Sequence, residues 1–362
     1  MVEPRESFLP DYAIPPGETL LETIEALGMT QKELSIRIDL SEKHIIDIIK
    51  GVGPITPETA LRLEKALRVP ASLWNNLERN YRGALARLAD EKRLRTEVAW
   101  LDEIPVNALM RMGLIEKHKS KVETLQEVLA FYGVHSPDEW RQLWGKTRFS
   151  ARQSAAFAAR PGAVTAWMRI GELAAQKIDC KPYEHGRFAE SLARIRSLTM
   201  TDPKNFQPTL AELCSDAGVA VVFVKELPGI HLSGITRWLS PQKALIQVCL
   251  RYKSDDQLWF TFFHESGHIL KHGKKDMFLE NDSGQDLEKE READKFAADL
   301  LIPPREWSKF TAGRARYLKA EIKAFARELG IAPGIVVGRL QYEKLLPFSH
   351  CNDLKVKLVW SS

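Results

Sequence analysis

Apolar residues recur at three- and four-residue intervals along most of the chain, which predicts a mainly helical protein. Within residues 13–82 these repeats are short, and capping residues open several of them: Thr30, Ser41 and Thr56. The pattern predicts five helices there, with a tight turn at residues 39–40 between the second and the third. Short helices joined by one tight turn indicate a helix-turn-helix domain.

The C-terminal half of the chain has a different pattern. Three runs rich in β-branched and aromatic residues, 218–224, 233–239 and 243–250, predict strands of a small, largely antiparallel sheet. Helical periodicity returns in residues 254–272 and 288–303. The predicted fold class is therefore α+β and mostly helical, with the sheet confined to a C-terminal domain. Either of the last two strands is a candidate to bind an extended peptide along its edge.

Length and composition are those of a globular protein with more than one domain. A chain of 362 residues with 44% hydrophobic residues has room for two or three domains. We expect a flexible tail over 1–12, the helix-turn-helix domain over 13–82, a helical middle region over 83–180, a second recognisable domain over 181–350 and a tail over 351–362. The middle region is interpreted as a spacer that is also a candidate dimer or partner surface.

The sequence indicates a cytoplasmic protein without membrane contact. No apolar run approaches the roughly 18 residues of a membrane span, and the first residues lack the features of a signal peptide. Cys180, Cys214, Cys249 and Cys351 are far apart and form no CxxC motif, which predicts reduced thiols. A net charge of +4 is too small to indicate nucleic-acid binding by itself.

The stretch TFFHESGHIL, residues 261–270, contains the motif HExxH. On a helix, His264 and His268 lie one turn apart on the same face, where two neutral imidazoles can bind one Zn²⁺. Glu265 follows the first histidine and can reach a water molecule instead of the metal. A capping box at Ser254 is expected to open this helix. The alternative is a buried helix whose histidines are only hydrogen-bonded, so the motif requires a third ligand.

The helix predicted over residues 288–303 offers that ligand. Glu292 borders its apolar face, where a carboxylate is costly to bury without a cation beside it. The alternative is a solvated glutamate in an acidic run. Glu288, Glu290 and Asp294 are assigned to the solvated face of this helix.

Three further residues are considered near the HExxH motif. His272 lies about 12 Å along the helix axis from His264, too far to share one tetrahedral ion, so we expect it to cap the helix or line the site. Tyr252, just before the helix, and His231, in the preceding loop, are candidate donors to an oxyanion.

The segments FTFFHESGHILKHG and EREADKFAADLLIP together resemble the ImmA/IrrE family of zinc metallopeptidases over roughly residues 205–345. The resemblance implies a zincin-like domain that binds Zn²⁺ through His264, His268 and Glu292, with Glu265 as the catalytic carboxylate. It also implies that the substrate is a regulatory protein such as a repressor or an antitoxin.

Residues 17–81 resemble the Xre-type helix-turn-helix of HigA-family antitoxins, through TQKEL, GVGPITPETALRL and LWNNLERNY. The resemblance implies operator DNA as a partner, a homodimer, and a small toxin as a further partner. It assigns DNA contacts to Gln31, Ser41, Glu42, Lys43, His44, Asp47 and Lys50, of which Gln31 and Lys50 lie near phosphates. Asp39 stands where the family usually has glycine, and aspartate enters the left-handed region more readily than most residues.

The charge of the helix-turn-helix segment moderates this expectation. Residues 13–82 carry nine Lys/Arg against ten Asp/Glu. Because phosphate neutralisation supplies most non-specific affinity, a monomer is expected to bind DNA weakly and a dimer to be needed. A helix-turn-helix that binds protein instead of DNA is the alternative.

Three functions are compatible with the sequence. The first is a regulator whose zinc-dependent endopeptidase domain cleaves a repressor or antitoxin in a stress, phage or toxin–antitoxin response. The second is a non-catalytic HigA-like antitoxin or autorepressor that uses the metal domain as a sensor or docking surface. The third is a scaffold without stoichiometric zinc.

Overall fold

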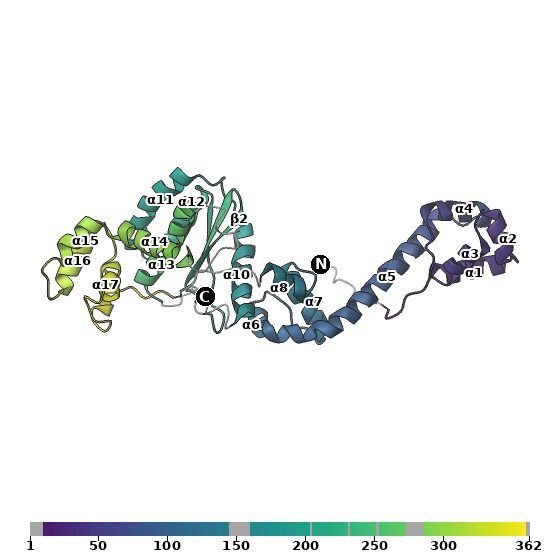
Figure 1. The fold of residues 1–362 in the computed structure, drawn as a ribbon, viewed down its shortest axis with the longest axis horizontal. Coiled ribbons are helices and arrows are strands. Elements are labelled where there is room, and N and C mark those ends of the chain that lie inside the picture. Colours follow the sequence, from purple (N-terminus) through teal and green to yellow (C-terminus); the bar gives the residue numbers. More distant parts are fainter. Residues whose placement is uncertain are drawn as a thin grey trace. The chain divides into compact units, whose positions relative to one another are not determined.

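A computed structural model describes residues 10–144, 160–202, 205–230, 232–250, 253–272 and 285–359 of the chain. The described residues form two compact units (Figure 1). The N-terminal unit extends to Val98 and includes Ser120–Gln126, and the C-terminal unit contains Ala99–Lys119 and the described residues from Glu127 onward. Among these residues no helix is both long and apolar enough to cross a bilayer.

Five helices begin the N-terminal unit: α1 (Pro16–Ala26), α2 (Gln31–Arg37), α3 (Glu42–Ile49), α4 (Pro57–Leu67) and α5 (Ala71–Glu97). The side chains of Thr30, Ser41 and Thr56 cap α2, α3 and α4, each accepting a hydrogen bond from the backbone N–H three residues on. The predicted five helices and these caps are confirmed, whereas α5 continues beyond residue 82, the predicted end of the domain.

The turn between α2 and α3 depends on Asp39. Its φ of 50° lies in the left-handed region, as the sequence predicted. Arg62 of α4 donates from Nη1 to the carbonyl oxygens of Ile38 and Asp39, at 2.9 and 2.8 Å. The turn is therefore fixed by a side chain from outside the helix pair that it joins.

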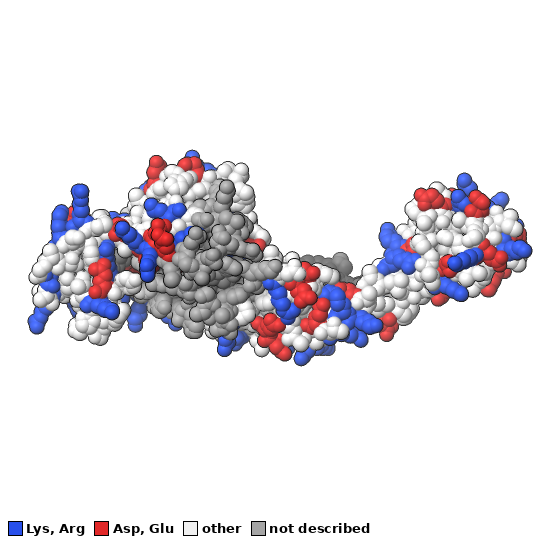
Figure 2. All heavy atoms as spheres, in the orientation of Figure 1, with Lys and Arg blue, Asp and Glu red and all other residues white. Residues whose placement is uncertain are grey.

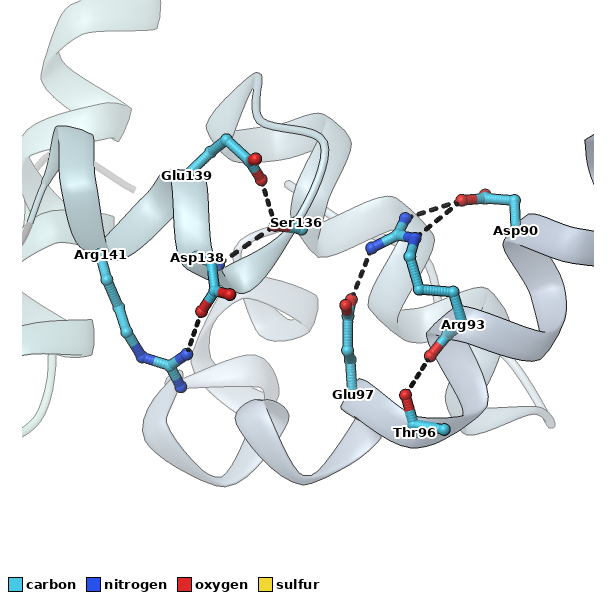
Figure 3. A network of polar contacts seen from close by, with 8 residues as sticks. All are labelled: Asp90, Arg93, Thr96, Glu97, Ser136, Asp138, Glu139 and Arg141. Carbon is cyan, nitrogen blue, oxygen red and sulfur yellow. Dashed lines mark hydrogen bonds and ion pairs between the residues drawn. The ribbon is translucent and has the colours of Figure 1, made fainter.

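Helix α5 is a single helix of 27 residues. Near its end, Arg93 donates to Asp90 and to Glu97, each at 2.7 Å (Figure 3). Pairs at this helical spacing stabilise a surface helix by about 0.2–0.5 kcal/mol each. The two Arg93 pairs therefore stabilise the C-terminal part of α5, where Leu94 is the buried residue.

The middle region is helical, as predicted, with α6 (Val106–Arg111), α7 (Lys121–Tyr132), α8 (Pro137–Leu143) and α10 (Pro161–Gln176), and with the 3-10 helix η1 (Val98–Glu103). Trp100, Tyr132 and Trp140 form an aromatic cluster, in which the rings of Trp100 and Trp140 lie 5.3 Å apart, edge to face. Ser136 caps α8 by accepting from the backbone N–H of Asp138 at 3.2 Å (Figure 3). The three aromatic side chains are buried and belong to the C-terminal unit.

The sheet has three strands, β1 (Val219–Phe223), β2 (Gly234–Ser240) and β3 (Lys243–Val248), in the order β1-β3-β2. β2 and β3 are antiparallel, but β1 is parallel to β3. The prediction of a largely antiparallel sheet is therefore wrong for one of its two pairs. The two-residue turn between β2 and β3 requires an antiparallel pair, whereas the longer connection after β1 imposes no such direction.

Helices cover both faces of the sheet. Gln247 of β3 donates to the carbonyl oxygen of Trp167 on α10 at 2.7 Å. On the opposite face, Thr236 of β2 donates to the carbonyl oxygen of Glu265 on α13 (Asp255–Lys271) at 3.0 Å. Side chains alternate between the two faces along a strand, which places Gln247 and Thr236 on opposite faces. The strand order puts β3 in the middle of the sheet, and β2 forms an edge next to α13.

The remaining helices of the C-terminal unit are α11 (His185–Ser197), α12 (Phe206–Ser215), α14 (Gln285–Leu301), α15 (Pro304–Thr311), α16 (Lys319–Leu329) and α17 (Pro333–Tyr342), with the 3-10 helices η2 (Leu198–Met200) and η3 (Asn352–Leu354). Residues 351–359 are not the predicted tail, because Leu354 and Leu358 are buried in the core. Within this segment, Lys357 forms an isolated antiparallel bridge with Ser254.

Candidate functional site

Helix α13 carries the HExxH motif, and its first residues are held by the C-terminal segment. Ser254 precedes the helix, but its side chain makes no capping hydrogen bond, so the predicted capping box is wrong. Instead, Asp255 Oδ1 accepts from the backbone N–H of Val356 at 2.9 Å. Asp256 pairs with Lys355 Nζ at 2.7 Å. Contacts from residues distant in sequence thus replace the local cap.

Helices α13 and α14 pack closely beside the motif. A Cβ added at Gly267 would lie 3.0 Å from the ring of Phe296 and 3.3 Å from Cα of Ala293. Ala293 and Ala297 of α14 are fully buried. Because these residues are small, side chains on α14 can reach the histidines of α13.

Three side chains converge at this helix pair. The Nε2 atoms of His264 and His268 are 3.1 Å apart. Glu290 of α14 places Oε2 3.3 Å from Nε2 of His264 and Oε1 3.2 Å from Nε2 of His268. Zn²⁺ with bonds of about 2.0–2.1 Å requires about 3.4 Å between neighbouring donors of a tetrahedron. The three groups therefore have the spacing of ligands to one ion.

The structure corrects the third residue of this group, which is Glu290 and not the predicted Glu292. The Glu292 side chain is 57% exposed and contacts His272. At 100° per residue, Glu290 points about 20° from Ala297, on the face that packs on α13, whereas Glu292 points about 140° away. A helical wheel centred on the buried alanines is the signal that would have identified Glu290.

Asp294 is the second residue for which the predicted position on the solvated face is wrong. Its Oδ1 lies 2.9 Å from Nδ1 of His264. A carboxylate only accepts hydrogen bonds, so Nδ1 of His264 carries the hydrogen and the lone pair of the neutral ring lies on Nε2. Asp294 thereby directs Nε2 of His264 towards Glu290 and His268.

His272 ends α13, where the sequence analysis placed it as a cap or lining residue. Its Nδ1 lies 2.9 Å from Nδ1 of His268, and its Nε2 lies 3.1 Å from Oε2 of Glu292. Burial and the nearby His268 lower the pKa of His272. Within this group, His272 and Glu292 occupy the side away from Glu290.

The electrostatics of the converging groups favour positive charge. Burial lowers the pKa of His264, but hydrogen bonds with Asp294 and Glu290 and the charge of Glu265 raise it overall, to about 10. Burial raises the pKa of Glu290, yet its contacts with the two histidines hold the pKa well below its usual range. Among the described residues, buried Oε1 of Glu290 has no hydrogen-bond partner besides its 3.2 Å contact with Nε2 of His268. The donor set therefore fits a divalent cation.

Glu265 is buried beside these groups, and burial raises its pKa. Gly234, at the start of β2, lies against it, since a Cβ there would be 2.9 Å from Oε1 of Glu265. The glycine therefore gives the carboxylate the space that it occupies. A buried carboxyl with a raised pKa can accept and return a proton near neutral pH.

A cavity of about 550 Å³ adjoins His264, Glu265 and Glu290. It lies between α13, α14, α17 and the start of β2. Apolar side chains line one part, including Leu301 and Ile335. Its volume is in the range of small-molecule sites. The cavity therefore has room for a side chain of a bound peptide next to the converging ligands.

The two predicted oxyanion donors, Tyr252 and His231, lie outside the described residues. Their assignment stays a prediction.

The residues predicted to contact DNA lie at the start of α2, on α3 and at the two ends of α3. Ile45 and Ile48 form the buried side of α3. The predicted contact residues are exposed or partly exposed: Gln31, Ser41, Glu42, Lys43, His44, Asp47 and Lys50. The visible face of the N-terminal unit carries Lys/Arg and Asp/Glu close together (Figure 2). Exposure is compatible with groove contacts, and the mixed charge agrees with the composition of this segment.

Comparisons with known families identify both segments. Residues 20–74 match the helix-turn-helix family model, and residues 238–341 match the M78 peptidase model, described as the IrrE N-terminal-like domain. No curated protein and no solved structure matched the chain. Residues 20–74 are thus similar to Xre-like helix-turn-helix domains and residues 238–341 to ImmA/IrrE-like, metallopeptidase-like domains, as the Xre-type and ImmA/IrrE resemblances predicted.

Proposed function

We propose that this chain is a zinc-dependent endopeptidase that cleaves a regulatory protein, with a helix-turn-helix domain that binds operator DNA. The observation that carries the proposal is the convergence of His264, His268 and Glu290 at the spacing of zinc ligands. Glu265 and the cavity beside them supply a proton acceptor and a place for the substrate. We assign the three converging residues as the ligands.

The mechanism follows from the position of Glu265. When bound, zinc supplies Lewis acidity to a water molecule and to the scissile carbonyl. Glu265 accepts a proton as the water oxygen bonds to the carbonyl carbon, and it returns the proton to the amine nitrogen as the carbon–nitrogen bond breaks. Asp294 keeps the ring of His264 oriented throughout.

An extended protein segment suits this site best. β2 is at the edge of the sheet, and the residues that begin it line the cavity. A substrate strand can pair with such an edge through its backbone and place one side chain in the cavity. Of the two strands considered as peptide-binding edges, the central position of β3 favours β2. By family resemblance, the substrate is a repressor or an antitoxin.

The proposal is tested with Glu265→Gln, which keeps the size of the side chain and removes its proton-accepting function. The purified chain, loaded with zinc, is incubated with the proteins encoded by the neighbouring genes, and cleavage is followed by mass spectrometry. We expect the native chain to cleave one of them and Glu265→Gln to be at least about 100-fold slower with zinc retained. Glu288→Gln, at an exposed position of α14, is the matched control. Cleavage by Glu265→Gln at the native rate would refute the assignment.

The helix-turn-helix match supports a second function, that of an antitoxin or autorepressor. In this function a homodimer binds operator DNA and a small toxin, and the metal domain serves as a sensor or docking surface. DNA-binding and toxin-binding assays distinguish the two functions. The second function requires that Glu265→Gln alter neither kind of binding and that no neighbouring protein be cleaved.

A further inference from the structure

Two side chains outside the ligand group form a chain of contacts that ends at His268. Nδ1 of His272 lies 2.9 Å from Nδ1 of His268. On the other side of the same ring, Nε2 of His272 lies 3.1 Å from Oε2 of Glu292. The side chain of His272 is 7% exposed, so water has little access to its nitrogens.

The direction of these hydrogen bonds follows from the chemistry of the groups. A carboxylate can only accept, so the hydrogen of His272 lies on Nε2 and points to Glu292. A neutral imidazole has one N–H and one lone pair, which makes Nδ1 of His272 an acceptor. The contact at 2.9 Å then requires a hydrogen on Nδ1 of His268. The lone pair of His268 consequently lies on Nε2.

That lone pair is where the ligand group needs it. Nε2 of His268 is the atom that lies 3.1 Å from Nε2 of His264 and 3.2 Å from Oε1 of Glu290. A metal ligand usually depends on the partner of its other ring nitrogen for its orientation. Asp294 provides that partner for His264, at 2.9 Å. In the described part of the chain, Nδ1 of His268 contacts His272 and no carboxylate.

We propose that His272 and Glu292 are positioning residues of the metal centre, which together fix the tautomer and the ring orientation of His268. The inference rests on the metal site proposed above and extends it by one layer. Glu292 comes from α14 and His272 from the end of α13, so the contact also depends on the packing of the two helices. The glutamate acts through two imidazole rings and does not touch the ion.

The test measures zinc affinity by competition with a chelator, in variants that keep or remove the acceptor. His272→Leu removes it, and we expect zinc to bind about 10- to 100-fold more weakly, as is usual when such outer contacts are lost. His272→Asn places an amide oxygen near the position of Nδ1 and should recover most of the affinity. Glu292→Ala should weaken binding severalfold, and Glu288→Ala, its matched control on the same helix, should not change it.

Nuclear magnetic resonance of the zinc-loaded chain with ¹⁵N-labelled histidine provides a readout that is independent of activity. The proposed N–H···N bond predicts a scalar coupling between Nδ1 of His268 and Nδ1 of His272. It also predicts a slowly exchanging proton on His268, which exchanges faster in Glu292→Ala. A role of His272 only in ending the helix predicts neither the coupling nor recovery by asparagine.

Several results would overturn the inference. One such result is native zinc affinity in both His272→Leu and Glu292→Ala. Another is the absence of the scalar coupling between the two Nδ1 atoms. A third is an equal loss of zinc affinity in His272→Leu and His272→Asn. If His272→Leu does not fold, Glu292→Ala decides the matter, because its side chain is 57% exposed. A native chain that binds no zinc would refute the metal site itself, which distinguishes that failure from failure of the positioning role.

Discussion

Replacing Asp255 with asparagine should stabilise the C-terminal unit at neutral pH. Asp255 is 3% exposed at the first position of α13. Oδ1 accepts from the backbone of Val356, but within the described part of the chain buried Oδ2 has no hydrogen-bond partner. Burial raises the pKa of Asp255 to about 6, against the lowering effect of the Val356 hydrogen bond. The ionised carboxylate is therefore unfavourable in the folded chain.

The size of the effect follows from the difference in pKa between the folded and the unfolded chain. An aspartate in an unfolded chain has a pKa of about 3.9, so the difference is about 2 units, or about 3 kcal/mol. The folded state binds the proton more tightly. The free energy of unfolding therefore falls as pH rises from about 4 to about 6, and the penalty is complete above that range.

Asparagine keeps an oxygen for the N–H of Val356 and carries no charge at any pH. At pH 8 we expect Asp255→Asn to raise the free energy of unfolding by up to about 3 kcal/mol, or the melting temperature by roughly 5–10 °C. This is an upper value, because the amide nitrogen replaces Oδ2 and also lacks a partner. At pH 4 the difference from the native chain should nearly disappear.

Chemical denaturation at both pH values measures the effect. Asp256→Asn is the control, because Asp256 pairs with Lys355 at 2.7 Å and its loss should destabilise the chain at pH 8. An Asp255→Asn variant with the same stability change at pH 4 and pH 8 would contradict the argument, since the gain would then have no connection with ionisation.

Three further changes test other parts of the structure. Glu290→Gln removes the negative charge of the proposed ligand and keeps the shape of its side chain. Zinc should then bind more than about 100-fold more weakly in a chelator competition. A larger loss of zinc affinity in Glu292→Gln would instead favour Glu292 as the ligand. Gly234→Ala adds a Cβ 2.9 Å from Oε1 of Glu265. It should lower kcat by roughly 10- to 100-fold with zinc affinity unchanged, and a native kcat would show that this contact does not position the carboxylate. Asp39→Gly relieves a left-handed residue and should raise the free energy of unfolding of the N-terminal unit by up to about 1 kcal/mol; in denaturant titrations, a decrease would contradict the assumed strain.

The parts of the fold that local chemistry determines could be predicted from the sequence. Thr30, Ser41 and Thr56 cap their helices with side-chain hydrogen bonds to residues three positions away. The left-handed turn at Asp39 is also a local feature. His264 and His268 lie on one helix, so their shared direction follows from helical geometry alone.

Features that depend on how elements pack could not be predicted in the same way. The third ligand depends on the rotation of α14 relative to α13, which the close contact at Gly267 fixes. The family resemblance and a position at the border of the apolar face favoured Glu292, whereas a helical wheel centred on Ala293 and Ala297 favours Glu290. The start of α13 is held by Lys355 and Val356, about a hundred residues away, so a local capping pattern at Ser254 was misleading.

The same limit applies to the sheet. The antiparallel pair of β2 and β3 follows from the short turn between them. The parallel pairing of β1 with β3 joins segments that are separated by a whole strand, and hydrophobic pattern does not encode the direction of such a pair.

The proposed ligands come from two helices, His264 and His268 from α13 and Glu290 from α14. An ion held by all three is therefore a cross-link between neighbouring segments as well as a reagent. A ligand that binds only the native chain adds about 1.4 kcal/mol to the free energy of unfolding for each tenfold increase of the free ligand concentration above its dissociation constant. If the proposed site binds its ion, we therefore expect metal starvation to destabilise the C-terminal unit, so that the abundance of the chain in a cell follows the supply of that ion.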